Sequence, residues 1–260
     1  MNLTLIVPIY NAAPFLPRSL GSIADQPDMR FIEVIVLDDG STDGSAEIAK
    51  EYAKRYGWRF VCFKYNQGVS AMRNLGIDMA RGKYITFLDA DDALSTNALE
   101  YIKAAIVANP DEKIIQFAHN RHIDDGPAAK PFITGHYKLG SVEKLPNHWW
   151  FVWNKVYKAE AIKDHRFRPI QYGEDELFNF ELLLQGVGIF QSGLTTVEKY
   201  FNNANSLAHR KTMTELIAQD EAVKALKSVY KLPSQQWNID ELLESHHNSA
   251  IYQSMGWKNQ

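Results

Sequence analysis

Short apolar runs alternate along the first half of the chain with stretches in which apolar residues recur every three or four positions. Runs of apolar and β-branched residues are typical of buried strands; they span residues 3–9, 31–37, 59–64, 84–88 and 113–118. Helical spacing occupies residues 15–23, 48–53, 72–79 and 97–108. This order predicts an α/β fold, with a Rossmann-like, mostly parallel sheet flanked by helices and joined by right-handed crossovers.

The second half of the chain is less regular. Residues 119–146 are polar and broken by Gly and Pro, which predicts a loop or hairpin insertion, and residues 187–201 predict irregular strands. The final residues show two more helical patterns, so we expect a main domain at 1–205 and a C-terminal helical extension at 206–260. Docking on the domain, a homo-oligomer contact and a peripheral membrane contact are the alternatives for this extension.

Composition narrows the class of protein. The 260 residues, 45% of them hydrophobic, suit one sizeable domain with an appendage. A net charge of −3 gives no reason to expect a nucleic-acid partner. Cys62 is the one cysteine, so no intrachain disulfide can form, and a reducing, cytoplasmic location is expected. Because Cys62 falls in a predicted strand, we expect a buried thiol.

Two acidic clusters directly follow predicted strands. Asp38 and Asp39 follow the second strand, and Asp89, Asp91 and Asp92 follow the fourth. Parallel strands bring both clusters to the carboxyl edge of the sheet, where open α/β folds bind their ligands. Three close acids need a compensating cation or hydrogen-bond donors, and hard divalent cations take such oxygen ligands. The alternative is a turn whose acids cap the next helix.

Two further groups of side chains are candidates for a site. Glu174 and Asp175 precede a periodic helix, where acids are also favoured simply by the helix dipole. Trp149 and Trp153 share a face if their segment is helical, and either pack in the core or form a platform for the apolar face of a sugar.

The ordered set of motifs resembles the family 2 glycosyltransferases, which have the GT-A fold. The resemblance covers roughly residues 3–205. It is carried by Val7-Pro8-Ile9-Tyr10-Asn11, Asp38-Asp39-Gly40-Ser41-Thr42-Asp43, Asn66-Gln67-Gly68 with Ala71, Arg73, Asn74 and Gly76, Gly82-Lys83-Tyr84-Ile85, Asp89-Ala90-Asp91-Asp92, Trp153-Asn154-Lys155 and Gly173-Glu174-Asp175. It implies a nucleotide-sugar donor, Mn²⁺ or Mg²⁺, and inversion at the anomeric carbon. It also divides the domain into a nucleotide-sugar-binding half at 1–118 and an acceptor-side half at 119–205.

The resemblance also implies roles for individual residues. The wall that holds the nucleoside base, usually uracil, would be formed by Pro8, Tyr10, Asp38 and Asp39. Gly68 and Arg73 would line the donor side. Asp89 would lie near the ribose and the metal, and Asp91 would be the principal metal ligand. Asp175 would be the catalytic base, with Glu174 beside it.

Acidic and basic residues of this kind suit the chemistry of sugar transfer. A divalent ion can neutralise the leaving diphosphate, and Lys155 is a candidate for a second positive charge there. A carboxylate can remove the proton of an attacking sugar hydroxyl, and one carboxylate suffices for a single inverting displacement. His209 is a candidate ligand or phosphate contact, although a surface histidine is the plainer interpretation.

We therefore expect transfer of a hexose or N-acetylhexosamine from a UDP-sugar to a carbohydrate or lipid-linked glycan acceptor, in bacterial surface polysaccharide synthesis. A nucleotidyltransferase is one alternative, but it would show a Gly- and basic-rich loop where residues 10–14 lie. A catalytically silent carbohydrate-binding module on the same fold is the other.

Overall fold

The computed structural model describes residues 3–122, 135–137, 150–170 and 173–200. The strands are β1 (Leu3–Ile9), β2 (Ile32–Asp38), β3 (Arg59–Cys62), β4 (Tyr84–Phe87), β5 (Ala93–Leu94), β6 (Ile114–His122), β7 (Gly135–Tyr137), β8 (Lys155–Lys158) and β9 (Ile189–Tyr200). The helices are α1 (Leu16–Ala24), α2 (Ser45–Tyr56), α3 (Val69–Met79), α4 (Ala98–Ala108), α5 (Ala159–Ile162) and α6 (Glu174–Leu184).

All the strands belong to one sheet, in the order β3-β2-β1-β4-β8-β6-β9-β5, with β7 paired to β9. The first four strands are parallel, with Leu3 in register with Ile32 on one side and Tyr84 on the other. β8 runs antiparallel between β4 and β6, and β5 and β7 run antiparallel to β9. The predicted α/β class is confirmed, and the sheet is mixed beyond its first four strands.

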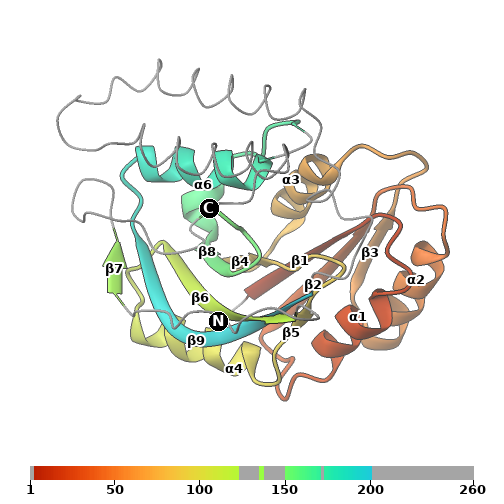
Figure 1. Ribbon diagram of the computed structural model, residues 1–260, viewed down its shortest axis with the longest axis horizontal. Helices are drawn as coiled ribbons and strands as arrows, with labels where there is room; N and C mark the ends of the chain where they lie inside the picture. Colours follow the sequence, from red (N-terminus) through yellow and green to blue (C-terminus); the bar gives the residue numbers. More distant parts are fainter. Residues whose placement is uncertain (1–2, 123–134, 138–149, 171–172, 201–260) are drawn as a thin grey trace, which may run out of the picture.

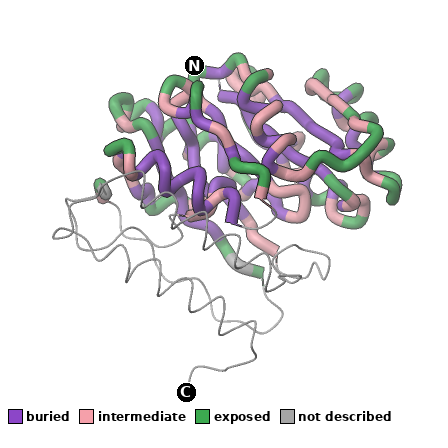
Figure 2. The backbone as a smooth tube through the Cα atoms, turned by 90° about the horizontal axis from the view of Figure 1, so that it is seen from above, coloured by how far each residue is buried: buried purple, intermediate pink, exposed green. Residues whose placement is uncertain are grey.

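Helices cover both faces of the sheet (Figure 1). Alternate residues of β1 point to opposite faces, as strand geometry requires. Leu5 and Val7 pack in the cluster that contains the inner residues of α1 and α4, whereas Ile6 packs in the cluster that contains those of α3 and α6. Figure 2 shows the buried residues concentrated in the middle of the fold and the exposed ones in the outer turns.

Close packing sets the position of α3 against β1. A Cβ added to Gly76 would lie 2.5 Å from Cγ2 of Ile6, so only glycine lets the helix approach the strand this closely. The approach matters for function because α3 carries Arg73 and Asn74 towards the carboxyl edge of the sheet.

Some predicted details are wrong. Cys62 is exposed rather than buried, because β3 is an edge strand of the sheet. The loop expected from residue 119 does not begin there, since β6 continues to His122, where it pairs with β9. Residues 189–200 form one strand instead of several irregular ones, and a short strand at 93–94 was not predicted.

Other predictions fall on residues that the structure does not describe. The terminal helices of the extension at 206–260, most of the insertion at 123–146, Trp149 and His209 lie outside the described residues. Within the residues that are described, no helix has both the length and the apolar character needed to cross a membrane.

Candidate active site

Both predicted acidic clusters lie at the carboxyl edge of the parallel strands. Asp38 ends β2, in register with Ile9 of β1 and Cys62 of β3. After β4, the backbone N–H of Leu88 donates to the carbonyl of Ile6 at 3.0 Å, so the chain stays in the sheet up to the residue before Asp89. Residues 89–92, called the acid loop below, therefore lie on the same edge as Asp38.

Asp39 has a structural task at this edge. Its side chain is buried and accepts the backbone N–H of Gln67 at 2.6 Å and that of Gly68 at 2.8 Å. Burial raises the pKa of Asp39 in spite of these two hydrogen bonds, which act in the opposite direction. Asp39 thus fixes the loop that enters α3, where Gly68 adopts a φ of +90°.

Asp38 and Tyr10 differ in exposure. Asp38 is fully buried and accepts the N–H of Ser41 at 3.1 Å through Oδ1, whereas its Oδ2 has no hydrogen-bond partner among the described residues. Tyr10 follows β1 and is 50% exposed. Pro8 is buried within β1. Of the predicted base-binding wall, Tyr10 is therefore the side chain open to a ligand.

The acid loop has the donor atoms that a divalent cation needs. One carboxylate oxygen from each of Asp89, Asp91 and Asp92 lies within 4.8 Å of the others. Carboxylate oxygens are the ligands preferred by Mg²⁺ and are suitable for Mn²⁺. The three side chains thus fit the predicted ion.

Asp92, to which the family resemblance gave no individual role, is the buried member of the loop. Its Oδ2 accepts Lys199 Nζ at 2.7 Å, and its Oδ1 accepts the backbone N–H of Tyr200 at 3.1 Å. Burial raises the pKa of Asp92 to about 7; Lys199 opposes the shift, and the charges of Asp89 and Asp91 add to it.

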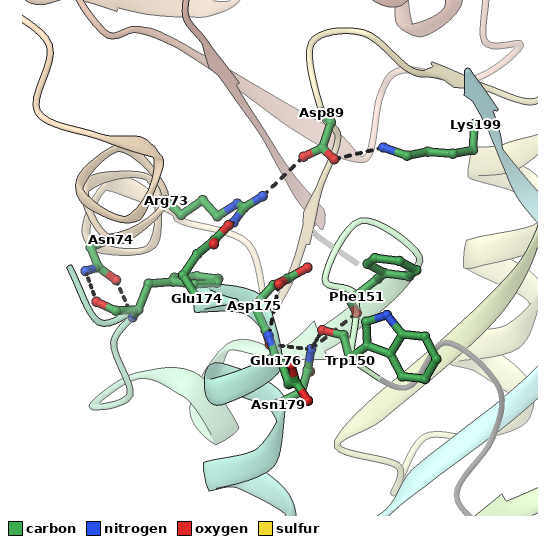
Figure 3. A network of polar contacts seen from close by, with 11 residues as sticks. Arg73, Asn74, Asp89, Trp150, Phe151, Glu174, Asp175, Glu176, Asn179 and Lys199 are labelled. Carbon is green, nitrogen blue, oxygen red and sulfur yellow. Dashed lines mark hydrogen bonds and ion pairs between the residues drawn. The ribbon is translucent and has the colours of Figure 1, made fainter. Parts of the chain in front are cut away.

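Arg73 joins the acid loop to the start of α6 (Figure 3). The buried guanidinium donates to Glu174 Oε1 at 2.6 Å and to Asp89 Oδ1 at 3.2 Å. Burial alone would raise the pKa of Asp89, but Lys199 and Arg73 together lower it. The predicted donor-side arginine is therefore also the ion-pair partner of two predicted site residues.

Asp175 stands at the N-terminus of α6 and is half-buried. Figure 3 shows it on the same side of the helix terminus as Glu174, below Arg73 and Asp89. Burial raises its pKa to about 8, with the neighbouring charge of Glu174 as the next cause and Arg73 opposing both. A carboxyl group with such a pKa is suited to exchange a proton near neutral pH.

Two side-chain amides, for which the sequence analysis proposed no role, hold the segments of the site together. Asn179 Nδ2 donates to the carbonyls of Trp150 at 2.8 Å and Asp175 at 3.0 Å, and its Oδ1 accepts the hydroxyl of Tyr157 at 2.8 Å. Asn74 exchanges two hydrogen bonds with the backbone of Phe167 at 2.8 and 2.9 Å. Asn179 could have been noticed in the sequence, because it is a polar residue within an otherwise apolar stretch of its helix.

Lys155 is deep inside the protein. It is 1% exposed, and its Nζ donates to Asn154 Oδ1 at 3.0 Å and to the carbonyl of Phe151. Burial lowers its pKa well below the ordinary value, although the charge of Asp175 opposes this. The structure therefore places Lys155 beneath the site, with its amine directed to protein oxygens.

Trp153 is 3% exposed, and the described residues before it, 150–152, are not helical; residues 150–154 form turns and bends before β8. Its ring centroid lies 4.8 Å from that of His119 and 4.9 Å from that of Phe151. These contacts favour core packing over a sugar platform for Trp153.

Lys199 is a site residue that the sequence analysis missed. Its Nζ donates to Asp92 and, at 3.2 Å, to Asp89 Oδ2. It follows Asp92 by 107 positions, and no local motif marks it as different from any other lysine in a strand. Only the pairing of β9 with β5 brings it to the acid loop.

Comparisons with known proteins agree with this geometry. Residues 4–166 match the model of glycosyl transferase family 2. EpsH of Bacillus subtilis, which bears a glycosyltransferase name, is 32% identical over 188 residues; the match covers 68% of this chain and 54% of EpsH. An uncharacterized glycosyltransferase of Haemophilus influenzae is 32% identical over 183 residues, with 70% of this chain and 71% of the relative covered.

Solved structures show the same fold. TarS of Staphylococcus aureus, solved with UDP-GlcNAc, has a TM-score of 0.76 at 20% identity, with 98% of this chain and 72% of that chain covered. The mannosyltransferase PcManGT of Pyrobaculum calidifontis, solved with GDP-Man and Mn²⁺, has a TM-score of 0.60 at 15% identity, with 97% and 81% covered. The fold, the acidic edge of the sheet and the family match lead to one conclusion: this chain belongs to the family 2 glycosyltransferases and is a glycosyltransferase.

Proposed function

We propose that this glycosyltransferase moves a hexose or N-acetylhexosamine from a nucleotide-sugar, most readily a UDP-sugar, to a hydroxyl of a carbohydrate or lipid-linked glycan. The observation that carries the proposal is the junction at the carboxyl edge of the sheet. There ion pairs of Arg73 of α3 join Asp89 of the acid loop to Glu174 of α6, the residue next to Asp175. The Staphylococcus aureus neighbour solved with UDP-GlcNAc supports a uridine nucleotide.

The donor's base is proposed to lie against the end of β1. The exposed ring of Tyr10 offers a surface on which a base can stack. Asp39 holds the loop at residues 66–68, which precedes Arg73 on the donor side. The buried Pro8 and Asp38 are proposed to back this base wall from within the sheet, and Gly68 is proposed to line the donor side.

Asp91 and Asp89 are the proposed ligands of a divalent ion, with Asp92 beside them. The clustering of their oxygens fits Mn²⁺ or Mg²⁺, and the archaeal neighbour was solved with Mn²⁺. When bound, such an ion supplies positive charge that stabilises the leaving diphosphate. Arg73 joins the acid loop to α6, so the proposed donor site and the proposed catalytic base, Asp175, are held at a fixed distance from each other.

Asp175 is the proposed base. The acceptor oxygen forms a bond to the anomeric carbon while the bond from that carbon to the diphosphate oxygen breaks, and the diphosphate leaves with the electron pair. The acceptor's proton passes to Asp175, whose raised pKa makes it a stronger base than an ordinary aspartate. One displacement at the anomeric carbon inverts its configuration, and Glu174 stays paired with Arg73 throughout.

The comparisons give no support to a nucleotidyltransferase or to a silent binding module. The proposal is tested by the melting temperature in the presence of UDP, GDP, dTDP, CMP and ATP, each with Mn²⁺ or with chelator. A ligand at 100 times its dissociation constant adds about 2.7 kcal/mol to the free energy of unfolding. UDP is expected to stabilise only with the metal. Equal melting temperatures with all five nucleotides would contradict the proposed donor site.

A further inference from the structure

Lys199 is a cation built into the acid loop. Its Nζ lies 2.7 Å from Asp92 Oδ2 and 3.2 Å from Asp89 Oδ2, and its side chain is 16% exposed. The other oxygen of Asp89 is bonded to Arg73. Asp89 and Asp92, which could both bind a divalent ion, are thus already paired with protein cations (Figure 3 shows the pairing at Asp89).

The surroundings of Lys199 keep its amine in this position. Ala93 of β5 pairs with Glu198 of β9, which fixes the position of the adjacent Lys199 along the strand. On the other side of Lys199, the backbone N–H of Tyr200 donates to Asp92. Nζ also lies 5.1 Å from the centroid of the buried Trp153 ring, a distance at which the ring face attracts a cation. The lysine is therefore held from both sides, unlike a freely moving surface amine.

A second contact holds the loop from outside. Arg18 donates to the backbone carbonyl of Asp91 at 2.6 Å, and its guanidinium carbon lies 3.5 Å from the centroid of the Tyr200 ring. The end of β9 and the acid loop are thereby bonded through side chains as well as through Asp92. Contacts with the protein itself therefore hold the loop in its shape.

A divalent ion that bonds to Asp89 or Asp92 must share that carboxylate with Lys199. Like charges a few ångströms apart repel strongly where solvent screening is weak. A nucleoside diphosphate brings negative oxygens to the same place, and these offset the excess positive charge. An ion that arrives with a diphosphate is therefore favoured over a free ion.

We propose that Lys199 is a positioning residue that acts as an internal counter-ion: it keeps free divalent ions weakly bound and makes tight metal binding depend on a nucleoside diphosphate. This inference rests on the proposed donor and metal site. It assigns to Lys199 a task in the order of ligand binding, beyond its contribution to the fold.

The test measures Mn²⁺ binding directly, by the loss of the electron paramagnetic resonance signal of free Mn²⁺, with and without UDP. Lys199→Gln removes the charge and keeps a hydrogen-bond donor, and Lys199→Met keeps the stem that packs near Trp153. Lys199→Arg keeps the charge. Lys103→Gln is the matched control, because Lys103 is half-exposed and pairs with Asp28 at 3.8 Å, away from the acid loop.

The wild type is expected to bind free Mn²⁺ weakly and to bind it much more tightly with UDP. Lys199→Gln and Lys199→Met should bind free Mn²⁺ at least tenfold more tightly than the wild type, with a smaller gain from UDP. Lys199→Arg and Lys103→Gln should match the wild type. A merely structural lysine would not produce tighter binding on removal.

Folded Gln and Met variants that bind free Mn²⁺ no more tightly than the wild type would overturn the inference and leave the proposed function intact. Loss of the cooperative melt in both variants would also overturn it, because Lys199 would then serve the fold alone. A wild type without Mn²⁺-dependent UDP binding would instead contradict the proposed donor site.

Discussion

The two acidic clusters at the sheet edge are stabilised in different ways. Asp39 is held by the backbone N–H groups of Gln67 and Gly68, which belong to the main chain and not to particular side chains. The acid loop is held by side-chain cations, Arg73 and Lys199, which only particular residues can supply. The first cluster thus depends on local chain geometry, and the second depends on long-range charge pairing.

This difference explains which substitutions should be severe. A backbone donor remains when a neighbouring side chain changes, as long as the loop keeps the conformation in which Gly68 has a φ of +90°. Removing one side chain from the second cluster leaves buried charges without partners, and such charges are costly. The chemistry is proposed to occur at the second cluster, where Asp175 faces the same network.

The largest effect is expected at the base. Asp175→Asn should lower transfer about 10²–10⁴-fold, because the acceptor hydroxyl loses its proton acceptor, while Mn²⁺–UDP binding stays near that of the wild type. Initial rates of UDP release and calorimetric UDP titration measure the two properties. Asp164→Asn, at an exposed position, is the matched control. Near-normal turnover by Asp175→Asn would remove this residue from the mechanism.

Arg73→Met tests the charge pairing itself. It leaves Glu174 and Asp89 without their shared partner, so the free energy of unfolding should fall by about 3–5 kcal/mol, as for other broken buried pairs. Arg166→Met removes an exposed pair with Asp78 and should cost under about 1 kcal/mol. Urea unfolding compares the two variants, and equal losses would show that burial of the Arg73 network contributes nothing.

Asp39→Asn probes the cluster that relies on the backbone. The amide retains one acceptor oxygen, but its NH₂ faces the other backbone N–H donor and cannot accept from it. The free energy of unfolding is therefore expected to fall by about 1–3 kcal/mol. Asp111→Asn, at an exposed position, should lie within about 0.5 kcal/mol of the wild type. If Asp39→Asn were as mild as this control, the loop at residues 66–68 would not depend on the carboxylate.

The pH dependence of stability sharpens the comparison at Asp175. Its pKa is about 8 in the folded chain and about 3.9 unfolded, so the folded state binds more protons between these values. Stability therefore falls as pH rises through this window. Asp175→Asn lacks that fall, and its stability relative to the wild type should increase by at least about 1 kcal/mol from pH 5 to pH 9. If the melting temperatures of Asp175→Asn and the wild type changed in parallel with pH, the raised pKa of Asp175 would be contradicted.

The same contrast separates what could be predicted from the sequence and what could not. The order of β1 to β4 and the placement of Asp38 and Asp89 at the same edge of the sheet follow from apolar periodicity and the handedness of crossovers, which are local or general properties. Lys199 could not be found in this way, because its partners are brought to it only by the pairing of β9 with β5. The placement of Cys62 in a predicted strand likewise gave the wrong expectation of a buried thiol. The local sequence does not distinguish an edge strand from a central one.

The central claim is that the junction around the acid loop binds a nucleotide together with a metal ion. Calorimetric titration of UDP into the wild type and Asp91→Ala, each with Mn²⁺ and with chelator, tests it most directly. The account predicts UDP binding by the wild type that requires Mn²⁺, and loss of that requirement with weak residual binding in Asp91→Ala. An identical metal response in both proteins would contradict the placement of the ion at the acid loop.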